Sequence, residues 1–129
     1  MAAVATQFDL VTLNCGDPRS VAEFWCAALR LHVTEDEDDG RWLVLSDVDS
    51  IRRLGLQRTD DELRPHTSHL FSARIHLDLR CTVEEFEAEL ARLQTLGARL
   101  IDRVRTESYG RIANLTDPAY HPFDLCAYG

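Results

Sequence analysis

Two stretches of the sequence, FDLVTLNCGDP at residues 8–18 and ARIHLDLRCTV at residues 73–83, decide the fold of this chain. Each stretch alternates apolar and polar residues, as a strand does, and ends in residues that begin a helix. The second stretch follows the first after about 66 residues. Because a single unit of this kind cannot bury its own apolar face, the repeat predicts two modules packed against each other.

In the first module we expect a strand over residues 8–15, followed by a helix with Asp17 as its N-cap and Pro18 in its first turn. Apolar residues at helical spacing give this helix one buried stripe, formed by Val21, Phe24, Trp25, Ala28 and Leu29. The acidic run at residues 35–40 is expected to be a solvated turn. Three further strands are expected, over residues 31–34, 41–46 and 51–59.

A polar segment at residues 60–72 is expected to link this module to the second one. There the strand that contains His76 leads to a capping box from Thr82 to Glu85 and to a helix that ends at Gly97. The apolar stripe of this helix is formed by Val83, Phe86, Leu90 and Leu93. Strands are expected over residues 98–104, 109–116 and 123–128.

These patterns predict an α+β fold in a single domain over residues 1–129. The domain consists of two βαβββ modules, at about residues 7–59 and 73–129. Together the modules form a pseudo-symmetric, curved mixed sheet with a concave groove.

The composition fits one globular domain and excludes several classes of function. The chain has 129 residues, of which 45% are hydrophobic and 28% charged, and its formal net charge is −8. This acidic balance argues against a nucleic-acid partner and an anionic membrane surface, and no apolar run is long enough to cross a bilayer. Because all 14 strong cations are arginines, Schiff-base chemistry and a P-loop lysine are excluded. The four cysteines lack C-x-x-C spacing and no signal peptide is recognisable, so we expect a cytoplasmic protein with reduced thiols.

Because side chains alternate between the two faces of a strand, the candidate site residues fall on one face of each module. The helices must cover the faces with the apolar residues, for example Val11 and Leu13 in the first module. The opposite, concave face then receives three residues from the first strand of each module: Leu10, Thr12 and Asn14, and His76, Asp78 and Arg80. The last strand adds Asp124 and Cys126. Since Gln57 is the counterpart of Asp124, we predict two pseudo-symmetric pairs at the groove, Leu10 with His76 and Gln57 with Asp124.

The same strings resemble the vicinal oxygen chelate superfamily, specifically its small glyoxalase-like branch beside the bleomycin-resistance and dioxygenase groups. The resemblance rests on VTLNCGDP, VAEFW, RIHLDL, LQTLGA and DPAYHPFDL, which begin at residues 11, 21, 74, 93 and 117. It implies a small-molecule site in the groove and a homodimer. In metal-dependent relatives the ligands lie on the first and last strand of each module, which here are the positions of Leu10, Gln57, His76 and Asp124.

This chain departs from that pattern in three places. Leu10 cannot bind a metal, Gln57 offers a neutral amide oxygen, and the segment 119–121 replaces the usual Gly-Asn turn before the last strand. The candidate ligands of one divalent ion (Zn, Ni, Mn or Fe) are therefore His76, Asp124 and Gln57, with water completing the shell. The other candidates for lining the groove are Leu10, Thr12, Asn14, Trp42, Arg74, Asp78 and Tyr109.

Alternative interpretations of these residues stay open at this point. One alternative is that His76 binds no metal and simply forms a hydrogen bond with a neighbouring carboxylate. Asp124 can likewise pair with Arg74, Arg80 or Arg111. Trp25, Trp42 and Tyr109 can belong to the core. We expect a protein that binds a small organic molecule in its groove, with no residue assigned to catalysis. The alternative is a metal-dependent lyase, isomerase or dioxygenase that acts on a substrate with vicinal oxygens.

Overall fold

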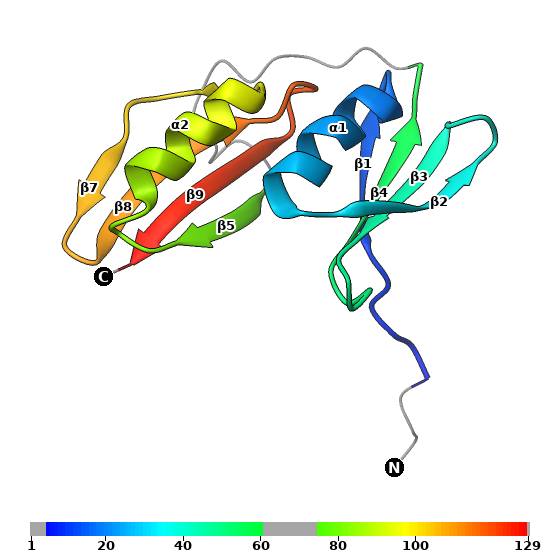
Figure 1. Ribbon diagram of the computed structural model, residues 1–129, viewed down its shortest axis with the longest axis horizontal. Helices are drawn as coiled ribbons and strands as arrows, with labels where there is room; N and C mark the ends of the chain where they lie inside the picture. The colour runs from blue at the N-terminus through cyan, green and yellow to red at the C-terminus, as the bar shows by residue number, and fades with distance from the viewer. Residues whose placement is uncertain (1–4, 61–74, 129) are drawn as a thin grey trace.

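The computed structural model describes residues 5–60 and 75–128, which form two sheets and two helices (Figure 1). The first sheet has the order β1-β4-β3-β2, and the second has the order β5-β9-β8-β6 with β7 paired to β8. The first module consists of β1 (Val11–Cys15), α1 (Pro18–Leu29), β2 (His32–Glu37), β3 (Trp42–Ser46) and β4 (Arg53–Arg58). The second consists of β5 (Leu77–Cys81), α2 (Phe86–Leu96), β6 (Arg99–Leu100), β7 (Arg105–Glu107), β8 (Gly110–Thr116) and β9 (Pro122–Tyr128).

The first strand of each module pairs in parallel with the last strand of the same module. Val11 lies beside Leu54 in the first sheet, and Leu77 lies beside Phe123 in the second. The remaining pairs are antiparallel, so both sheets are mixed. The α+β class and the repeated βαβββ order are therefore confirmed, with β7 as an additional strand in the second module, and β1 and β5 each lie at an edge of their sheet.

Helix α1 begins and ends as its sequence predicts. The Asp17 carboxylate accepts a hydrogen bond from the Ser20 amide, and Pro18 occupies the first turn. The helix ends at Arg30, which adopts a left-handed conformation with φ of 54°. Its buried stripe contains Val21, Ala22, Phe24, Trp25 and Ala28, whereas Leu29 lies at the margin and is 37% exposed.

Helix α2 is preceded by the predicted capping box. The Glu85 carboxylate accepts from the Thr82 amide and hydroxyl, and the Thr82 hydroxyl accepts from the Glu85 amide. The regular helix starts only at Phe86, so Val83 lies in the preceding turn and is partly exposed, contrary to the predicted stripe. Gly97, with φ of 123°, ends the helix.

Strand boundaries account for the other differences from the predicted elements. Strand β2 continues through the acidic run to Glu37 because Asp36 and Glu37 pair with β3, so the turn begins only at Asp38. The predicted strand at residues 98–104 is reduced to β6, and β7 was not predicted at all. Residues 61–72 of the predicted linker lie outside the described residues.

Helix α1 joins the two modules into one core. Figure 1 shows α2 lying across β8 and β9, with α1 between the two sheets. Trp25 is fully buried, and its ring centroid lies 5.0 Å from that of Phe24 and 5.2 Å from that of Phe123 on β9. Trp25 is thus a core residue, as expected, and it belongs to one continuous cluster that includes apolar residues of both modules.

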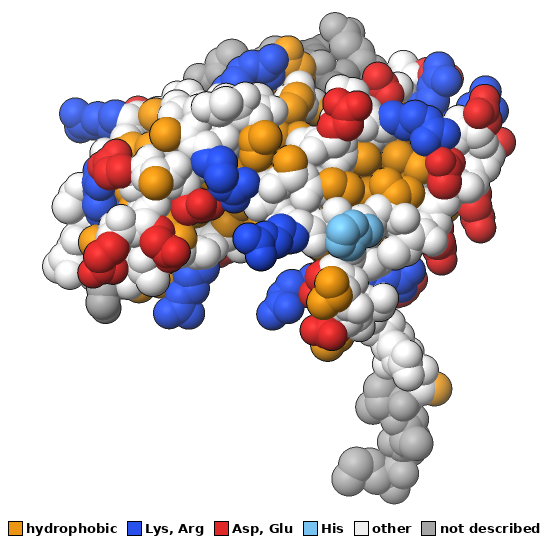
Figure 2. Space-filling model, viewed as in Figure 1, with side chains coloured by type: hydrophobic (Ala, Val, Ile, Leu, Met, Phe, Trp, Pro, Cys, Tyr) orange, Lys and Arg blue, Asp and Glu red, His pale blue; other side chains and the backbone are white. Residues whose placement is uncertain are grey.

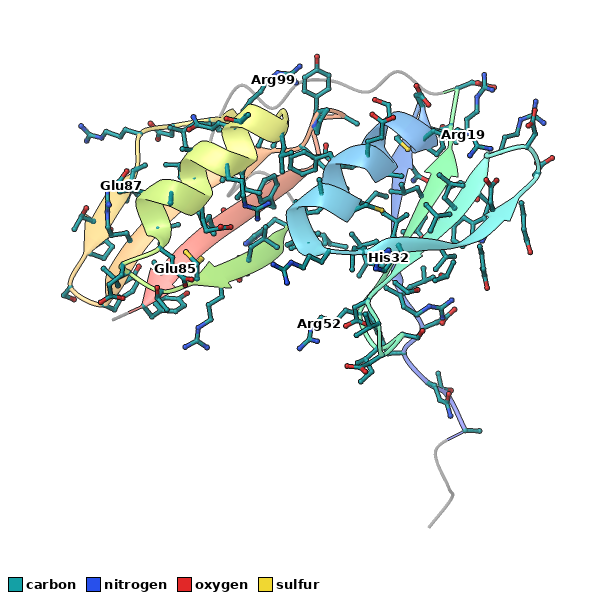
Figure 3. All side chains as sticks on the ribbon, viewed as in Figure 1. Arg19, His32, Arg52, Glu85, Glu87 and Arg99 are labelled. Carbon is teal, nitrogen blue, oxygen red and sulfur yellow. The ribbon has the colours of Figure 1, made fainter. Side chains whose placement is uncertain are left out.

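The surface around this core mixes the two signs of charge. On the face drawn in Figure 2, arginine and acidic side chains are interspersed. Several of them form ion pairs, such as the one between Arg19 on α1, labelled in Figure 3, and Asp36 on β2 at 2.9 Å. Neither helix among the described residues is long and apolar enough to span a bilayer.

Candidate functional site

The helix-free face of each sheet carries the residues that alternation assigns to it. In β1, Val11, Leu13 and Cys15 pack against the core, whereas Thr12 and Asn14 are exposed on the other face. In β9 the core side is formed by Phe123 and Leu125, which leaves Asp124 and Cys126 on the helix-free side. The predicted division into two faces is confirmed.

Three potential metal ligands meet on the helix-free face of the second sheet. Asp78 on β5 lies directly beside Asp124 on β9 in the strand register. His76 immediately precedes β5, and its Nε2 atom lies 3.2 Å from Oδ1 of Asp78 and 3.5 Å from Oδ2 of Asp124. One ligand atom from each residue can be chosen so that all three lie within 4.8 Å of one another. We call these three residues the metal triad.

Asn114 fixes the orientation of Asp124. Its Nδ2 atom donates to Oδ1 of Asp124 at 2.7 Å, which leaves Oδ2 directed toward His76. The Asp124 side chain is only 14% exposed. Burial raises the pKa of this carboxyl, while the hydrogen bond from Asn114 and the nearby His76 oppose the rise.

The triad has a donor set that suits a divalent transition metal. One imidazole nitrogen and two carboxylate oxygens are ligands that Zn, Ni, Mn and Fe accept. Three protein ligands leave coordination positions for water or for oxygen atoms of a ligand. The third donor is Asp78 on β5, two residues along the chain from His76, rather than a residue of the first module at the position of Leu10.

The predicted arginine partners of Asp124 lie elsewhere. Arg111 forms an ion pair with Glu87 and lies over the Phe86 ring, on the side of the sheet that α2 covers. Arg80 is stacked on the ring of Tyr128 at 5.7 Å. Arg74 lies outside the described residues. Among the described residues no arginine nitrogen lies within 4.0 Å of an Asp124 oxygen.

The remaining predicted site residues lie mostly on the first sheet. Leu10, Thr12 and Trp42 surround Gly55, where an added Cβ atom would lie 2.5 Å from the Trp42 ring. Gln57 is on β4, and its Nε2 atom donates to the Arg41 carbonyl at 3.5 Å. Its role as a metal ligand stays a prediction. Tyr109 was expected in a strand but lies in the turn between β7 and β8, 55% exposed, with its ring 6.2 Å from that of Tyr128.

A cavity of about 360 Å³ lies where β1 and the start of β5 approach each other. It brings together three predicted residues, Thr12, Asn14 and His76, with two that sequence reasoning did not assign to the groove, Tyr120 and His121. The cavity therefore has walls from both modules, as a shared groove requires.

The loop that carries Tyr120 and His121 is held by a buried carboxylate. Asp117 is fully buried; its Oδ1 atom accepts from the amides of Ala119 and His121, and its Oδ2 atom accepts from the Trp25 indole at 2.9 Å. Oδ2 also lies 2.7 Å from Nδ1 of His121. Tyr120 adopts a left-handed φ of 69°, at the turn where the resemblance leads one to expect glycine and asparagine.

His121 connects this loop to the first module. Its Nε2 atom lies 2.7 Å from the Asn14 carbonyl, and its Nδ1 atom faces Asp117. Because both partners are acceptors, the imidazole satisfies both only when it is protonated on both nitrogens. Burial alone lowers the pKa of His121, but the hydrogen bond and charge of Asp117 and the contact with Asn14 outweigh it and raise the pKa. The spacing of Asp117 and His121 around Pro118 is a sequence signal that could have indicated this turn.

The sequence of residues 10–126 matches the glyoxalase-like domain family. The chain belongs to this family. It is thereby a member of the vicinal oxygen chelate superfamily, and its two βαβββ modules form the glyoxalase and bleomycin-resistance fold. No curated protein matches the sequence of this glyoxalase-like protein.

Solved structures agree with the family assignment at the level of the fold. One is a mutant of the fosfomycin resistance protein FosX from Listeria monocytogenes, complexed with Mn(II) and 1S,2S-dihydroxypropylphosphonic acid; it is 15% identical, with a TM-score of 0.74 over 98% of this chain and 93% of that chain. FosX from Mesorhizobium loti is 13% identical, with a TM-score of 0.71 over 98% and 95% of the two chains. A protein from Agrobacterium tumefaciens solved by NMR is 15% identical, with a TM-score of 0.68 over 96% and 98%.

Proposed function

We propose that this glyoxalase-like protein binds a small organic molecule together with one divalent metal ion on the helix-free face of its second sheet. The observation that carries the proposal is the metal triad, in which His76, Asp78 and Asp124 bring one ligand atom each within 4.8 Å of the others. A structural neighbour, FosX, is complexed with Mn(II) and a small phosphonic acid, which supports a site of this kind on this fold.

Each residue of the site has a separate role in this proposal. His76, Asp78 and Asp124 hold the ion, and Asn114 keeps one Asp124 oxygen occupied so that the other faces the ion. The bound ion supplies a Lewis acid for oxygen atoms of the ligand. Thr12 and Asn14 contribute polar groups to the wall of the adjacent cavity.

Binding without turnover is the favoured activity. The first module presents Leu10 and Gln57 at the positions where metal-dependent relatives have ligands, and neither side chain can transfer a proton or act as a nucleophile near neutral pH. The metal ligands therefore come from the second module alone. The first module forms a wall of the groove, with the apolar side chain of Leu10 and the amide of Gln57. We place this binding function in the cytoplasm.

A homodimer is part of the proposal. Strands β1 and β5 each have one paired side only, and unpaired edges are normally covered. A cavity of about 650 Å³ lies between the modules beside these edges, lined by residues that include Phe8 and Ile51, which are 85% and 74% exposed. Such exposed apolar groups beside open edges favour contact with a second copy. Sedimentation equilibrium at micromolar concentration should give twice the chain mass of 14.7 kDa, and a monomer there would contradict the dimer.

Metal uptake tests the binding function. Equilibrium dialysis against Zn, Ni, Mn and Fe(II) should show one ion per chain for the wild type. The variants His76→Ala, Asp78→Asn and Asp124→Asn should each bind at least about 10-fold more weakly, while the exposed-turn variant Asp49→Asn should bind as the wild type does. Metal should also raise the unfolding temperature of the wild type, since it binds only the native state. The proposal fails if the wild type takes up none of the four ions, or if the three triad variants retain full affinity.

A further inference from the structure

Two rows of side chains cross the helix-free face of the second sheet. The first row contains Asp78, Asp124 and Asn114, which are neighbours on β5, β9 and β8. The second row lies two residues further along the strands, or about 7 Å away. It contains Arg80, Cys126, Ile112 and Arg105, on β5, β9, β8 and β7 in that order. A row with two carboxylates is thus bordered by a row that has an arginine at each end.

Arg105 has an unsatisfied hydrogen-bond donor. Its Nε atom is buried and forms no hydrogen bond. Among the described residues it is the only buried side-chain nitrogen or oxygen without a hydrogen-bond partner. A buried donor left without an acceptor costs about 1–3 kcal/mol, more for a charged group. No carboxylate oxygen of the described residues lies within 4.0 Å of its guanidinium nitrogens. Its positive charge nevertheless opposes the rise that burial causes in the pKa of Asp124 and of Cys126.

Arg80, at the other end of the row, also lacks a carboxylate partner among residues 5–60 and 75–128. Its guanidinium is stacked on the Tyr128 ring. By contrast, Arg19, Arg53 and Arg92 each form an ion pair with an acidic side chain. The two residues between the arginines, Cys126 and Ile112, are buried, so the floor of the row is apolar.

The net charge of the metal triad and the two arginines indicates which kind of ligand group fits beside the triad. Two carboxylates and one divalent ion are neutral together, so the loaded site takes its sign from the two arginines. A guanidinium presents parallel N–H donors that match the two oxygens of a carboxylate or of a phosphate-type group. An incoming oxyanion would give Arg105 Nε the acceptor that the chain itself does not provide.

We infer that Arg105 binds a carboxylate or phosphate-type oxyanion of the ligand, beside the metal triad. This inference rests on the proposed function, because it assigns a chemical class to the ligand of the same groove. It makes Arg105 the residue that selects anionic over neutral ligands. Since ion and oxyanion occupy adjacent positions of opposite charge, each should increase the affinity of the other by the same factor.

Small aromatic probes test this inference. Benzoate and phenylphosphonate carry the two types of oxyanion, and benzamide is the neutral isostere of benzoate. Calorimetric titration of the wild type, with and without the metal it takes up, should show binding of at least one anion and at least about 10-fold weaker binding of benzamide. Comparison of the two anions shows whether the site prefers a planar or a tetrahedral group.

Variants at neighbouring positions supply the controls. Arg105→Gln should weaken anion binding at least about 10-fold and leave benzamide binding unchanged, and Arg105→Lys should fall between it and the wild type. Arg103→Gln, which changes an exposed arginine two residues away outside the strand, should bind as the wild type does. Because the Nε donor is unsatisfied, Arg105→Gln should unfold at the same or a higher urea concentration than the wild type.

The outcomes separate the inference from the proposed function. If metal binds but Arg105→Gln retains the anion affinity of the wild type, or if the wild type binds neither anion, the inference is wrong and the metal site stands. If no metal binds and Arg105→Gln still loses the anion, the metal part of the proposed function is wrong and the oxyanion site stands.

Discussion

Replacing Asp117 by Asn should destabilise the protein in a way that depends on pH. The substitution keeps the shape of the side chain but turns one acceptor oxygen into an NH₂ group. If the remaining oxygen continues to accept from the amides of Ala119 and His121, the NH₂ group faces the Trp25 indole and Nδ1 of His121. Both of those groups are donors when His121 is protonated.

The size of the effect follows from the number of partners that are lost. Below the ordinary histidine pKa of about 6.5, the variant buries an imidazolium without its carboxylate and leaves the indole N–H unpaired, which should cost about 3–5 kcal/mol. Above that pH, a neutral His121 can turn an unprotonated Nδ1 toward the new NH₂ group and still donate to Asn14. Then only the indole is unpaired, and the cost should fall to about 1–3 kcal/mol.

The sign of the pH dependence can be checked by linkage. In the wild type the pKa of His121 is raised, so the stability it contributes is present below about pH 6.5 and is lost as pH rises through the folded-state pKa. In Asp117→Asn the burial of His121 remains without the carboxylate, so protonation works against folding. The difference in unfolding free energy between the two proteins must therefore be larger at pH 5.5 than at pH 8.

Urea unfolding followed by tryptophan fluorescence at pH 5.5 and pH 8 measures this difference. Asp49→Asn, in an exposed turn, is the matched control and should change stability by less than about 0.5 kcal/mol at both values. A loss that is equal at the two pH values would refute the protonated state of His121. A variant as stable as the wild type would refute the role of Asp117 as a whole.

Three further substitutions test the backbone and packing. Gly55→Ala would place a Cβ atom 2.5 Å from the Trp42 ring, so we expect about 1–3 kcal/mol of destabilisation and a shifted fluorescence maximum. Gly110→Ala would bring a Cβ atom 2.0 Å from the Ala127 carbonyl at a φ of +152°, so its urea midpoint should fall further than that of Gly55→Ala, and an equal or smaller fall would contradict this reading. Thr82→Ala removes the hydroxyl of the capping box and should cost about 0.5–2 kcal/mol in urea unfolding; a change within error would show that the box does not stabilise α2.

The periodic parts of the fold could be predicted because each depends on a local pattern. Alternation along β1 correctly separated Leu13 from Thr12, and Asp17 and Pro18 marked the start of α1, whereas α2 begins only after the predicted capping box. Strand β7 was missed because the apolar residues of segment 98–104 suggested one continuous strand. Only the antiparallel pairing of Arg105 with Ile112 across the turn shows that a second, polar strand begins there.

The candidate site was predictable in part for the same reason. His76 and Asp124 were found from alternation and the family resemblance. Asp78 was placed on the correct face but only as a residue lining the groove, since its closeness to Asp124 depends on the parallel register of β5 with β9. The contacts of Asp117 with Trp25 and His121 could not be predicted, because they depend on how α1 and the loop between β8 and β9 pack.

The hydrogen bond between Trp25 and Asp117 spans 92 residues, and this separation has a consequence for synthesis. At a translation rate of 5–20 residues per second, roughly 5–18 seconds pass between the polymerisation of one partner and that of the other. During this interval the apolar side of α1 has no second module to contact. The nascent chain therefore exposes one of its largest aromatic side chains to chaperones until the last turn of the protein has been made, and release of a chain that stops before Asp117 would leave that surface open.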